Sequence, residues 1–171
     1  IICAGSLLGV KLKRFKYSFP VGKVNMIEMY PMDFEEFLWA LDKELLVSEI
    51  KKSFVYNKEM VNPVHEKALN LYRLYQITGG MPECVKNMVD VECDIIKYDT
   101  SIIKNIISSY FKDMDKYILN ASESLKIERT YQSIPSQLSN ESNKFQYSKI
   151  INGAKSREYD TAIDWLEASN M

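Results

Sequence analysis

The sequence has few of the residues that break or cross-link a chain, and each shortage excludes a class of protein. Its 171 residues, enough for one good-sized domain or two small ones, include only 6 glycines and 5 prolines, too few for a loop-rich or disordered chain. Three cysteines without a CxxC pair and a single histidine offer no zinc-binding set, so we expect no metal site and reduced thiols. A formal net charge of −1 lacks the basic excess of a dedicated nucleic-acid-binding protein.

Signals for membranes and secretion are also missing. No apolar run approaches the roughly 20 residues of a membrane-spanning helix, and the start has neither a basic stretch nor a cleavage site. The chain opens on Ile1 and Ile2 with no initiator methionine, as expected of a segment that starts inside a buried strand. These features predict a soluble, cytoplasmic fragment of a larger protein, without contact with a membrane.

The common catalytic motifs are absent as well. A phosphate-binding loop reads GxxxxGK followed by serine or threonine, whereas the one Gly-Lys pair, Gly22-Lys23, precedes Val24. One histidine, His65, allows no Ser-His-Asp or Cys-His arrangement. Asp113 and Asp115 lie two apart on a predicted helix, so they cannot form an acid-base pair.

What the sequence does contain predicts a mainly α protein. Hydrophobic residues make up 46% of the chain, with 11 tyrosines and 7 phenylalanines to fill a core. Short buried strands are expected at residues 1–4 and 24–30, the second with apolar residues on both faces. Helices are expected from residue 33 onward and at 45–54, 62–78, from 82, 95–119, 127–133, 135–139 and 155–168, with a linker at 120–124.

Local signals indicate where these helices start and stop. Asp33 followed three residues later by Glu36 has the form of a capping box. Asn62-Pro63 is typical of a helix start, and Gly79-Gly80 of a helix end. The stretch Gly79-Gly80-Met81-Pro82 also permits close approach of the backbone to a ligand or another helix, and an interhelical turn is the favoured interpretation.

The last segment, 127–171, has the proportions of a winged-helix unit. One interpretation places four basic residues against DNA phosphates: Lys144, Lys149, Lys155 and Arg157. The other makes the unit a module that packs on protein. Nearby carboxylates, including Glu158 and Asp160, favour the protein-packing interpretation.

Several ordered motifs carry a resemblance to a known family. They are Ala4-Gly5-Ser6-Leu7-Leu8-Gly9, Ser18-Phe19-Pro20-Val21-Gly22-Lys23-Val24, Met29 through Leu38, Gly79-Gly80-Met81-Pro82-Glu83, Ser133 through Leu138, Phe145-Gln146-Tyr147-Ser148, Glu158-Tyr159 and Trp165-Leu166. Together they resemble the second half of the AAA domain in a prokaryotic AAA+/STAND-like P-loop ATPase family that has a C-terminal DUF4143 domain. The resemblance implies a remnant of a P-loop parallel sheet, a helical lid and a winged-helix-like end.

The same resemblance implies roles for particular residues. Gly5 and Ser6 would lie at the sensor 1 position near the γ-phosphate, with Ser6 in the catalytic role. Gly79, Gly80 and Pro82 would contact the nucleotide where the lid begins. ATP and magnesium would bind the full-length protein, with Walker motifs upstream, and nothing would bind tightly to the fragment. The implied domains are 1–60 (end of the ATPase core), 61–122 (lid) and 123–171 (winged-helix-like domain).

Three functions follow as expectations. The leading one is the sensor and lid portion of an ATP-dependent switch, which binds nucleotide in the full-length protein and is not catalytic as a fragment. The alternative is a winged-helix module without enzyme activity that binds DNA, through Lys155 and Arg157, or a protein. The third is a scaffold whose ATPase has degenerated. Unpaired strand edges would favour a homo-oligomer.

Overall fold

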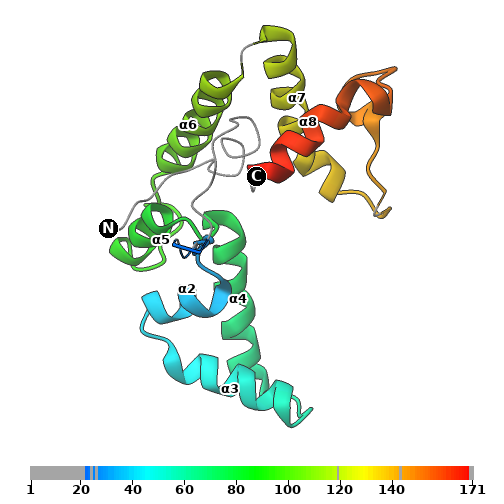
Figure 1. Cartoon of the computed structure of the whole chain (residues 1–171). Coiled ribbons are helices and arrows are strands. Elements are labelled where there is room, and N and C mark those ends of the chain that lie inside the picture. The colour runs from blue at the N-terminus through cyan, green and yellow to red at the C-terminus, as the bar shows by residue number, and fades with distance from the viewer. Residues whose placement is uncertain (1–21, 24, 26, 119, 143, 170–171) are drawn as a thin grey trace. The chain divides into compact units, whose positions relative to one another are not determined.

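The structure is a computed structural model of the whole chain, and it describes residues 22–23, 25, 27–118, 120–142 and 144–169. These residues form helices joined by turns, with no strand among them (Figure 1). The prediction of a mainly α chain is confirmed. In chain order the elements are α2 (Phe34–Ala40), α3 (Glu44–Val55), α4 (Asn62–Thr78), α5 (Pro82–Asp90), α6 (Ser101–Tyr117), α7 (Ala121–Leu138), the 3-10 helix η1 (Tyr147–Lys149) and α8 (Ser156–Ala168).

The predicted remnant of a parallel sheet is not shown. The strand expected at 1–4 lies outside the described residues, and in the strand expected at 24–30 the described residues, 25 and 27–30, belong to no strand. A strand exists only where a neighbour accepts its backbone hydrogen bonds, and these residues have no such partner within the described part of the chain. Ile27 and Met29, expected inside a sheet, are 90% and 95% exposed.

The chain divides into two compact units. One, the Met26–Ile107 unit, holds α2 to α5 and the first turns of α6. The other, named here the C-terminal unit, holds the rest of α6 from Ser108 with α7, η1 and α8. The division expected from the resemblance, into segments 1–60, 61–122 and 123–171, stays a prediction.

The core of the Met26–Ile107 unit forms where α2 packs on α3, α4 and α5. The rings of Phe34, Phe37 and Tyr75 meet there, with centroids 5.4–6.4 Å apart. Burial of such apolar surface is the main force that holds the helices together. The buried residues of this core are Phe37, Leu38, Leu41, Leu46, Val47, Ala68, Leu71, Val85, Met88 and Tyr98.

Tyr98 brings a hydroxyl into this core. The side chain is 5% exposed, and its oxygen makes no hydrogen bond of ordinary geometry, although the Cys84 thiol lies near it. Burial, followed by the effect of Cys84, raises the pKa of Tyr98 above its ordinary value of 10.0. The folded state therefore requires the neutral phenol.

This requirement predicts a loss of stability in alkali. Because the folded pKa is raised, the contribution of Tyr98 is fully present below pH 10 and is lost as the pH rises beyond it. Tyr98→Phe should reduce this decline and change the free energy of unfolding at pH 7 by less than about 1 kcal/mol, since no ordinary hydrogen bond is removed. Urea unfolding between pH 7 and 10.5 measures both effects, with the exposed Tyr56→Phe as control. An unchanged alkaline slope would contradict the prediction.

The predicted helix starts are confirmed in α2 and α5 and shifted by one residue in α4. The Asp33 carboxylate accepts a hydrogen bond from Glu36 N at 2.8 Å, and the Glu36 carboxylate accepts one from Asp33 N at 2.9 Å, which completes the capping box. Pro82 opens α5 as expected. Val61 is the N-cap of α4, so Asn62 is its first helical residue and Pro63 lies in its first turn.

Three helices end in a left-handed residue that is not glycine. These residues are Asp42 after α2, Asn57 after α3 and Glu92 after α5, with φ of 56°, 48° and 51°. In α5 the next residue, Cys93, donates its N–H to Met88 O at 3.0 Å, five residues back, and Glu92 donates to the carbonyl three back. This is the Schellman arrangement, which satisfies the last carbonyls of a helix.

The turn between α4 and α5 is the predicted interhelical turn. Gly79 has φ 66° and ψ −170°, a conformation that is essentially restricted to glycine, and its N–H donates to Tyr75 O at 2.7 Å. Gly80 packs on the backbone before α2, where Met32 N donates to Gly80 O at 2.8 Å. The Tyr75 hydroxyl donates to Met32 O at 2.9 Å. The backbone that Gly80 approaches closely is therefore part of the same chain.

The helix expected at 95–119 begins later, at Ser101. The Asp99 carboxylate accepts a hydrogen bond from Ser101 N at 2.9 Å, as a residue at a helix start does. Hydrogen bonds from Ser101 hold the pKa of Asp99 below its usual value. The side chain of Asn87 also accepts from Asp99 N at 2.9 Å, which ties this turn to α5. The apolar pattern before Ser101 belongs to turns.

The short helices expected at 127–133 and 135–139 are one helix, α7, and the linker expected at 120–124 contains its first turn. The Asn120 side chain caps this helix by accepting from Ser122 N at 2.9 Å. A proline lacks an N–H and would separate two helices at Pro135, yet α7 continues through it. The helix packs on α8, and its last turn is also hydrogen-bonded to the loop that follows it.

The C-terminal unit has a core of its own, made by the facing sides of α6, α7 and α8. Trp165 of α8 is 5% exposed within it, and Ile127 of α7 is fully buried. The buried residues of this core are Met114, Ile118, Ile127, Ala162, Trp165 and Leu166.

A winged helix is not shown, because its wing requires strands and the described residues between α7 and α8 form a loop and η1. The loop is held to α7 by side chains. Gln137 donates to Gln146 O at 2.8 Å and accepts from Gln146 N at 3.0 Å. The Lys149 ammonium donates to Ser136 O and to Asn140 Oδ1.

Within the described ranges, none of the helices is both long enough and apolar enough to cross a membrane. The longest, α7, has 18 residues and includes Glu123, Lys126 and Arg129. Its pattern is that of an amphipathic helix with one face on a core.

Candidate functional site

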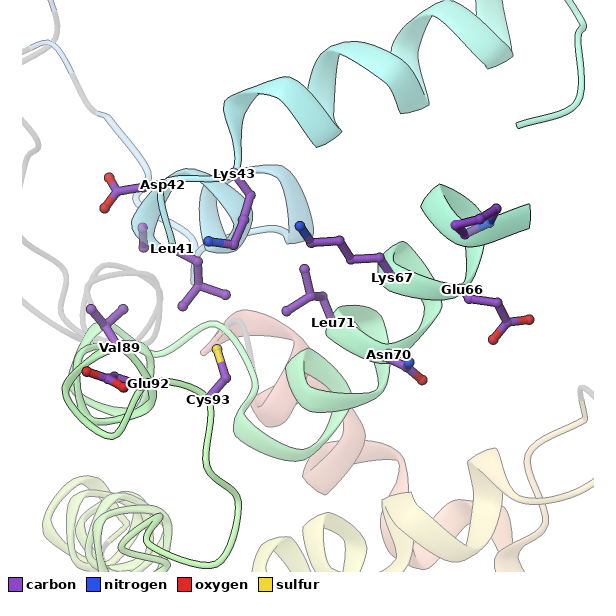
Figure 2. Close-up of a pocket in the computed structure, with 12 residues that line it drawn as sticks. Leu41, Asp42, Lys43, Glu66, Lys67, Asn70, Leu71, Val89, Glu92 and Cys93 are labelled. Carbon is purple, nitrogen blue, oxygen red and sulfur yellow. The ribbon is translucent and has the colours of Figure 1, made fainter. Parts of the chain in front are cut away.

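The candidate site is a hollow of about 690 Å³ on the Met26–Ile107 unit (Figure 2). Three elements surround it: the end of α2, the first half of α4 and the end of α5. Its volume is within the range of about 300–1,000 Å³ that is usual for ligand-binding sites. The lining residues are Ala40, Leu41, Asp42, Lys43, Pro63, Glu66, Lys67, Asn70, Leu71, Val89, Glu92 and Cys93.

The hollow exists because two helices end beside a third. The turns after α2 and α5 reverse the chain through Asp42 and Glu92, and both of these left-handed residues line the hollow. Cys93, with φ 63°, continues the second turn. The positive φ values of these residues serve to end the two helices, so by themselves they do not indicate a catalytic or binding site.

The floor is apolar and the rim is charged. Leu41 and Leu71 are buried residues of the core that also face the hollow, and Val89 packs beside them. The rim consists of the polar lining residues: Asp42, Lys43, Glu66, Lys67, Asn70 and Glu92. An apolar floor with a few polar groups around it is the usual build of a binding site.

Two lysines dominate the opening. In Figure 2, Lys67 extends from α4 toward the end of α2 and Lys43 lies beside Leu41, while Asp42 and Glu66 point outward on opposite sides. Neither ammonium group forms an ion pair with a carboxylate of the described residues. Each can therefore pair with an anion that enters the hollow.

Cys93 places a thiol at the edge of the floor. Burial raises the pKa of Cys93, and the nearby Lys43 partly opposes this effect. The thiol is therefore neutral near pH 7, which makes it a poor nucleophile. No group of three or more histidine, cysteine, aspartate or glutamate side chains suited to a metal ion occurs among the residues that the structure describes.

The structure does not bring the predicted nucleotide residues together at this hollow. Gly5 and Ser6 lie outside the described residues. Gly79, Gly80 and Pro82 form the turn between α4 and α5, and none of them lines the hollow. Gly80 is buried against the Met32 backbone, so in this structure its missing side chain serves internal packing.

The predicted DNA-contacting residues are exposed at the start of α8. Lys155 is the N-cap of this helix and Arg157 lies in its first turn, next to Glu158. No described residue forms an ion pair with either one. DNA binding by this pair stays a prediction.

Sequence reasoning missed the hollow entirely. Lys43 lies in a connection between helices and Lys67 lies on α4, and each looks ordinary in its local sequence. They are 24 residues apart, and only the packing of α2 on α4 brings them together. No local motif could have revealed such a pair.

A second surface without a partner lies at the turn between α3 and α4. Phe54, Val55 and Tyr56 are 87%, 72% and 75% exposed, and Val61 beyond the turn is 68% exposed. Phe54 follows Val47 and Ile50 along the apolar stripe of α3, but this stripe extends past the helices that cover its first half. The described residues provide no cover for it.

Comparison with known proteins assigns the chain to a family. The sequence profile described as "Domain of unknown function (DUF8612)" matches residues 69–171, which is more than half of the chain. No curated protein and no solved structure gives a significant match. The matched region begins in the middle of α4 and includes Asn70, Leu71, Val89, Glu92 and Cys93 of the hollow.

This match overturns the resemblance to the AAA+/STAND-like ATPases with a DUF4143 domain, which was wrong. The motifs that carried the resemblance, such as Asp33 with Glu36 and Gly79-Gly80-Met81-Pro82, are signals that end one helix and start the next. Unrelated helical proteins need the same signals, because every helix end has unsatisfied backbone groups. The chain belongs to the DUF8612 family, which is defined by a domain of unknown function.

Proposed function

We propose that the Met26–Ile107 unit is a protein-binding module whose hollow holds a short extended segment with apolar side chains and a carboxylate. The observation that carries the proposal is that Lys43 and Lys67, neither of them paired with a carboxylate of the described residues, line a hollow with an apolar floor (Figure 2). This keeps the protein-binding alternative expected from the sequence but places it on the Met26–Ile107 unit. The nucleotide switch is not proposed, because the family that suggested it does not match.

The apolar floor supplies the first part of the recognition. Leu41, Leu71 and Val89 present a continuous apolar surface at the bottom of an open hollow. Each apolar side chain that fills such a surface contributes roughly 25 cal/mol for every Å² removed from water. A segment with two apolar side chains on one face would cover this floor.

The two ammonium groups supply the second part. A carboxylate of the bound segment gains an attractive contact with each ammonium group that it reaches, Lys43 or Lys67. Both lysines are at the rim, where solvent weakens such contacts to about 1 kcal/mol or less each. The charges therefore provide selectivity for a carboxylate, and the floor provides most of the affinity.

Titration with two matched peptides tests the proposal. We expect acetyl-Leu-Glu-Leu-Phe-amide to bind with a Kd of about 0.1–1 mM and to shift amide resonances of residues that line the hollow. Acetyl-Leu-Lys-Leu-Phe-amide, with the same apolar residues, should bind about tenfold more weakly, because its charge faces the two lysines. Raising the salt concentration should weaken only the first complex.

The double variant Lys43→Met/Lys67→Met should reduce the affinity for the acidic peptide about tenfold and bring the two peptides to similar affinities. Lys86→Met, at an exposed residue of α5 that does not line the hollow, is the matched control and should change neither affinity. Equal binding of both peptides by the wild-type chain, or shifts confined to other surfaces, would refute the proposal.

A further inference from the structure

The chain itself carries a segment of the chemistry that the hollow fits. Ile27, Met29 and Tyr30 are 90%, 95% and 69% exposed, and Glu28 lies among them. The segment belongs to no helix and leads into α2 (Figure 1). Its three large apolar or aromatic side chains surround one carboxylate, and the described residues leave all of them facing solvent.

The two faces of this segment differ. The Tyr30 hydroxyl donates a hydrogen bond to the Glu28 carboxylate, so the side chains of Glu28 and Tyr30 lie on one side. When the segment binds as extended backbone, in which residues two apart share a face, Ile27 and Met29 lie on the other. One face is therefore apolar, and the opposite face carries the negative charge.

The segment cannot use the hollow of its own chain. Met32, two residues after Tyr30, is fixed at the other end of α2 by its bonds to Gly80 O and from the Tyr75 hydroxyl. The hollow begins beyond the opposite end of this helix, at Ala40 to Lys43. The high exposure of Ile27 and Met29 also shows that they do not contact the apolar floor of the hollow.

We propose that a second copy of this chain fills the hollow with its segment Ile27–Tyr30, and that two copies exchange these segments to form a closed dimer. This rests on the proposed function of the hollow and names its occupant. Ile27 and Met29 of one copy cover Leu41 and Leu71 of the other, and Glu28 lies between Lys43 and Lys67. The segment, about 13 Å long, is short enough for a site of this size.

Reciprocal exchange gives two identical contacts related by a two-fold axis, which closes the assembly at two copies. Each contact is small, so the dimer belongs to the weak class of interfaces, with a Kd of about 10–100 μM. One exchange accounts for both the unpaired lysines and the uncovered apolar segment.

Sedimentation velocity of the full chain between about 1 and 300 μM tests this inference. The wild-type chain should dimerise, whereas Glu28→Lys and Lys43→Glu/Lys67→Glu should each raise the dimer Kd at least tenfold, because like charges then meet in both contacts. An equimolar mixture of these two variants should dimerise again, since each charged segment meets a hollow of opposite charge. A fold defect would not be repaired by mixing.

Dimers that are unaffected by Glu28→Lys, or variants that fail to pair when mixed, would overturn the inference. A second experiment tests the dimer and the binding function of the hollow separately. It measures binding of acetyl-Ile-Glu-Met-Tyr-amide to the Glu28→Lys chain, whose hollow is unchanged. A peptide that binds while the wild-type chain stays monomeric overturns the dimer and leaves the proposed function standing. If the peptide does not bind and the chain stays monomeric, both proposals fail.

Discussion

Replacing Gly80 with alanine should remove most of the stability of the Met26–Ile107 unit. A Cβ atom at this position would lie 1.9 Å from Met32 O, 2.8 Å from Met32 C and 2.9 Å from Met32 N. These are backbone atoms, so they cannot move aside as the end of a flexible side chain can. Overpacking of this kind costs about 3 kcal/mol.

The displacement would also break bonds. Met32 N donates to Gly80 O, and the Tyr75 hydroxyl donates to Met32 O. Each contributes roughly 0.5–1.5 kcal/mol, so Gly80→Ala should lower the free energy of unfolding by about 4–6 kcal/mol in total. This approaches the whole stability of many domains, which is about 5–15 kcal/mol.

Urea unfolding monitored by circular dichroism measures this loss, and amide hydrogen exchange in α2, α4 and α5 locates it. Gly153→Ala is the control, because Gly153 has a positive φ of 81° but a Cβ added to it would meet no atom within 4 Å. Gly153→Ala should lower the free energy of unfolding by only about 1–2 kcal/mol, because alanine is strained at a positive φ. Adding Met32→Gly to Gly80→Ala should not restore stability, since the clash is with backbone. A loss below about 1 kcal/mol in Gly80→Ala would contradict the observed packing.

Phe37→Ala should have the second large effect, a loss of about 3–5 kcal/mol. Phe37 is fully buried, and its ring lies 5.4 Å from that of Tyr75 and 6.4 Å from that of Phe34. Truncation removes the buried ring from the centre of α2 and leaves a cavity that the surrounding helices fill only in part. Thermal and urea unfolding both measure the loss.

Phe54→Ala is the matched control, because it deletes the same ring from the surface. Phe54 is 87% exposed, so the change in the free energy of unfolding should stay within about 0.5 kcal/mol. A cost above about 1 kcal/mol for Phe54→Ala would mean that this ring is packed in solution, against the structure. Similar losses of stability for Phe37→Ala and Phe54→Ala would contradict the placement of Phe37 in the core and Phe54 on the surface. The same core forms the floor of the hollow.

The local part of the fold could be predicted from the sequence. The capping box of Asp33 and Glu36, the start of α5 at Pro82 and the end of α4 at Gly79 all follow from residues within one turn of each other. The helices expected from residue 33 and at 62–78 were also correct, since α2 spans Phe34–Ala40 and α4 spans Asn62–Thr78. Neighbours in sequence determine these features, so no tertiary knowledge is needed.

Predictions that needed the tertiary structure went wrong. Pro135 suggested two helices, but α7 runs through it as one helix that packs on α8. The apolar residues around Ile27 suggested a buried strand, but burial depends on a neighbour that the pattern does not specify. Two of the apparent ATPase motifs, Asp33 with Glu36 and Gly79-Gly80-Met81-Pro82, are signals that start or end helices.

The sequence by itself determined that this protein is mainly α and where several of its helices begin and end, because caps, prolines and glycines act within a few residues. Only the tertiary structure decided that Gly80 faces the Met32 backbone and that Phe37 is buried while Phe54 is exposed. It alone placed Lys43 and Lys67 at one hollow with an apolar floor. These outcomes depend on contacts between residues far apart in the chain, and such contacts are settled by how the helices pack.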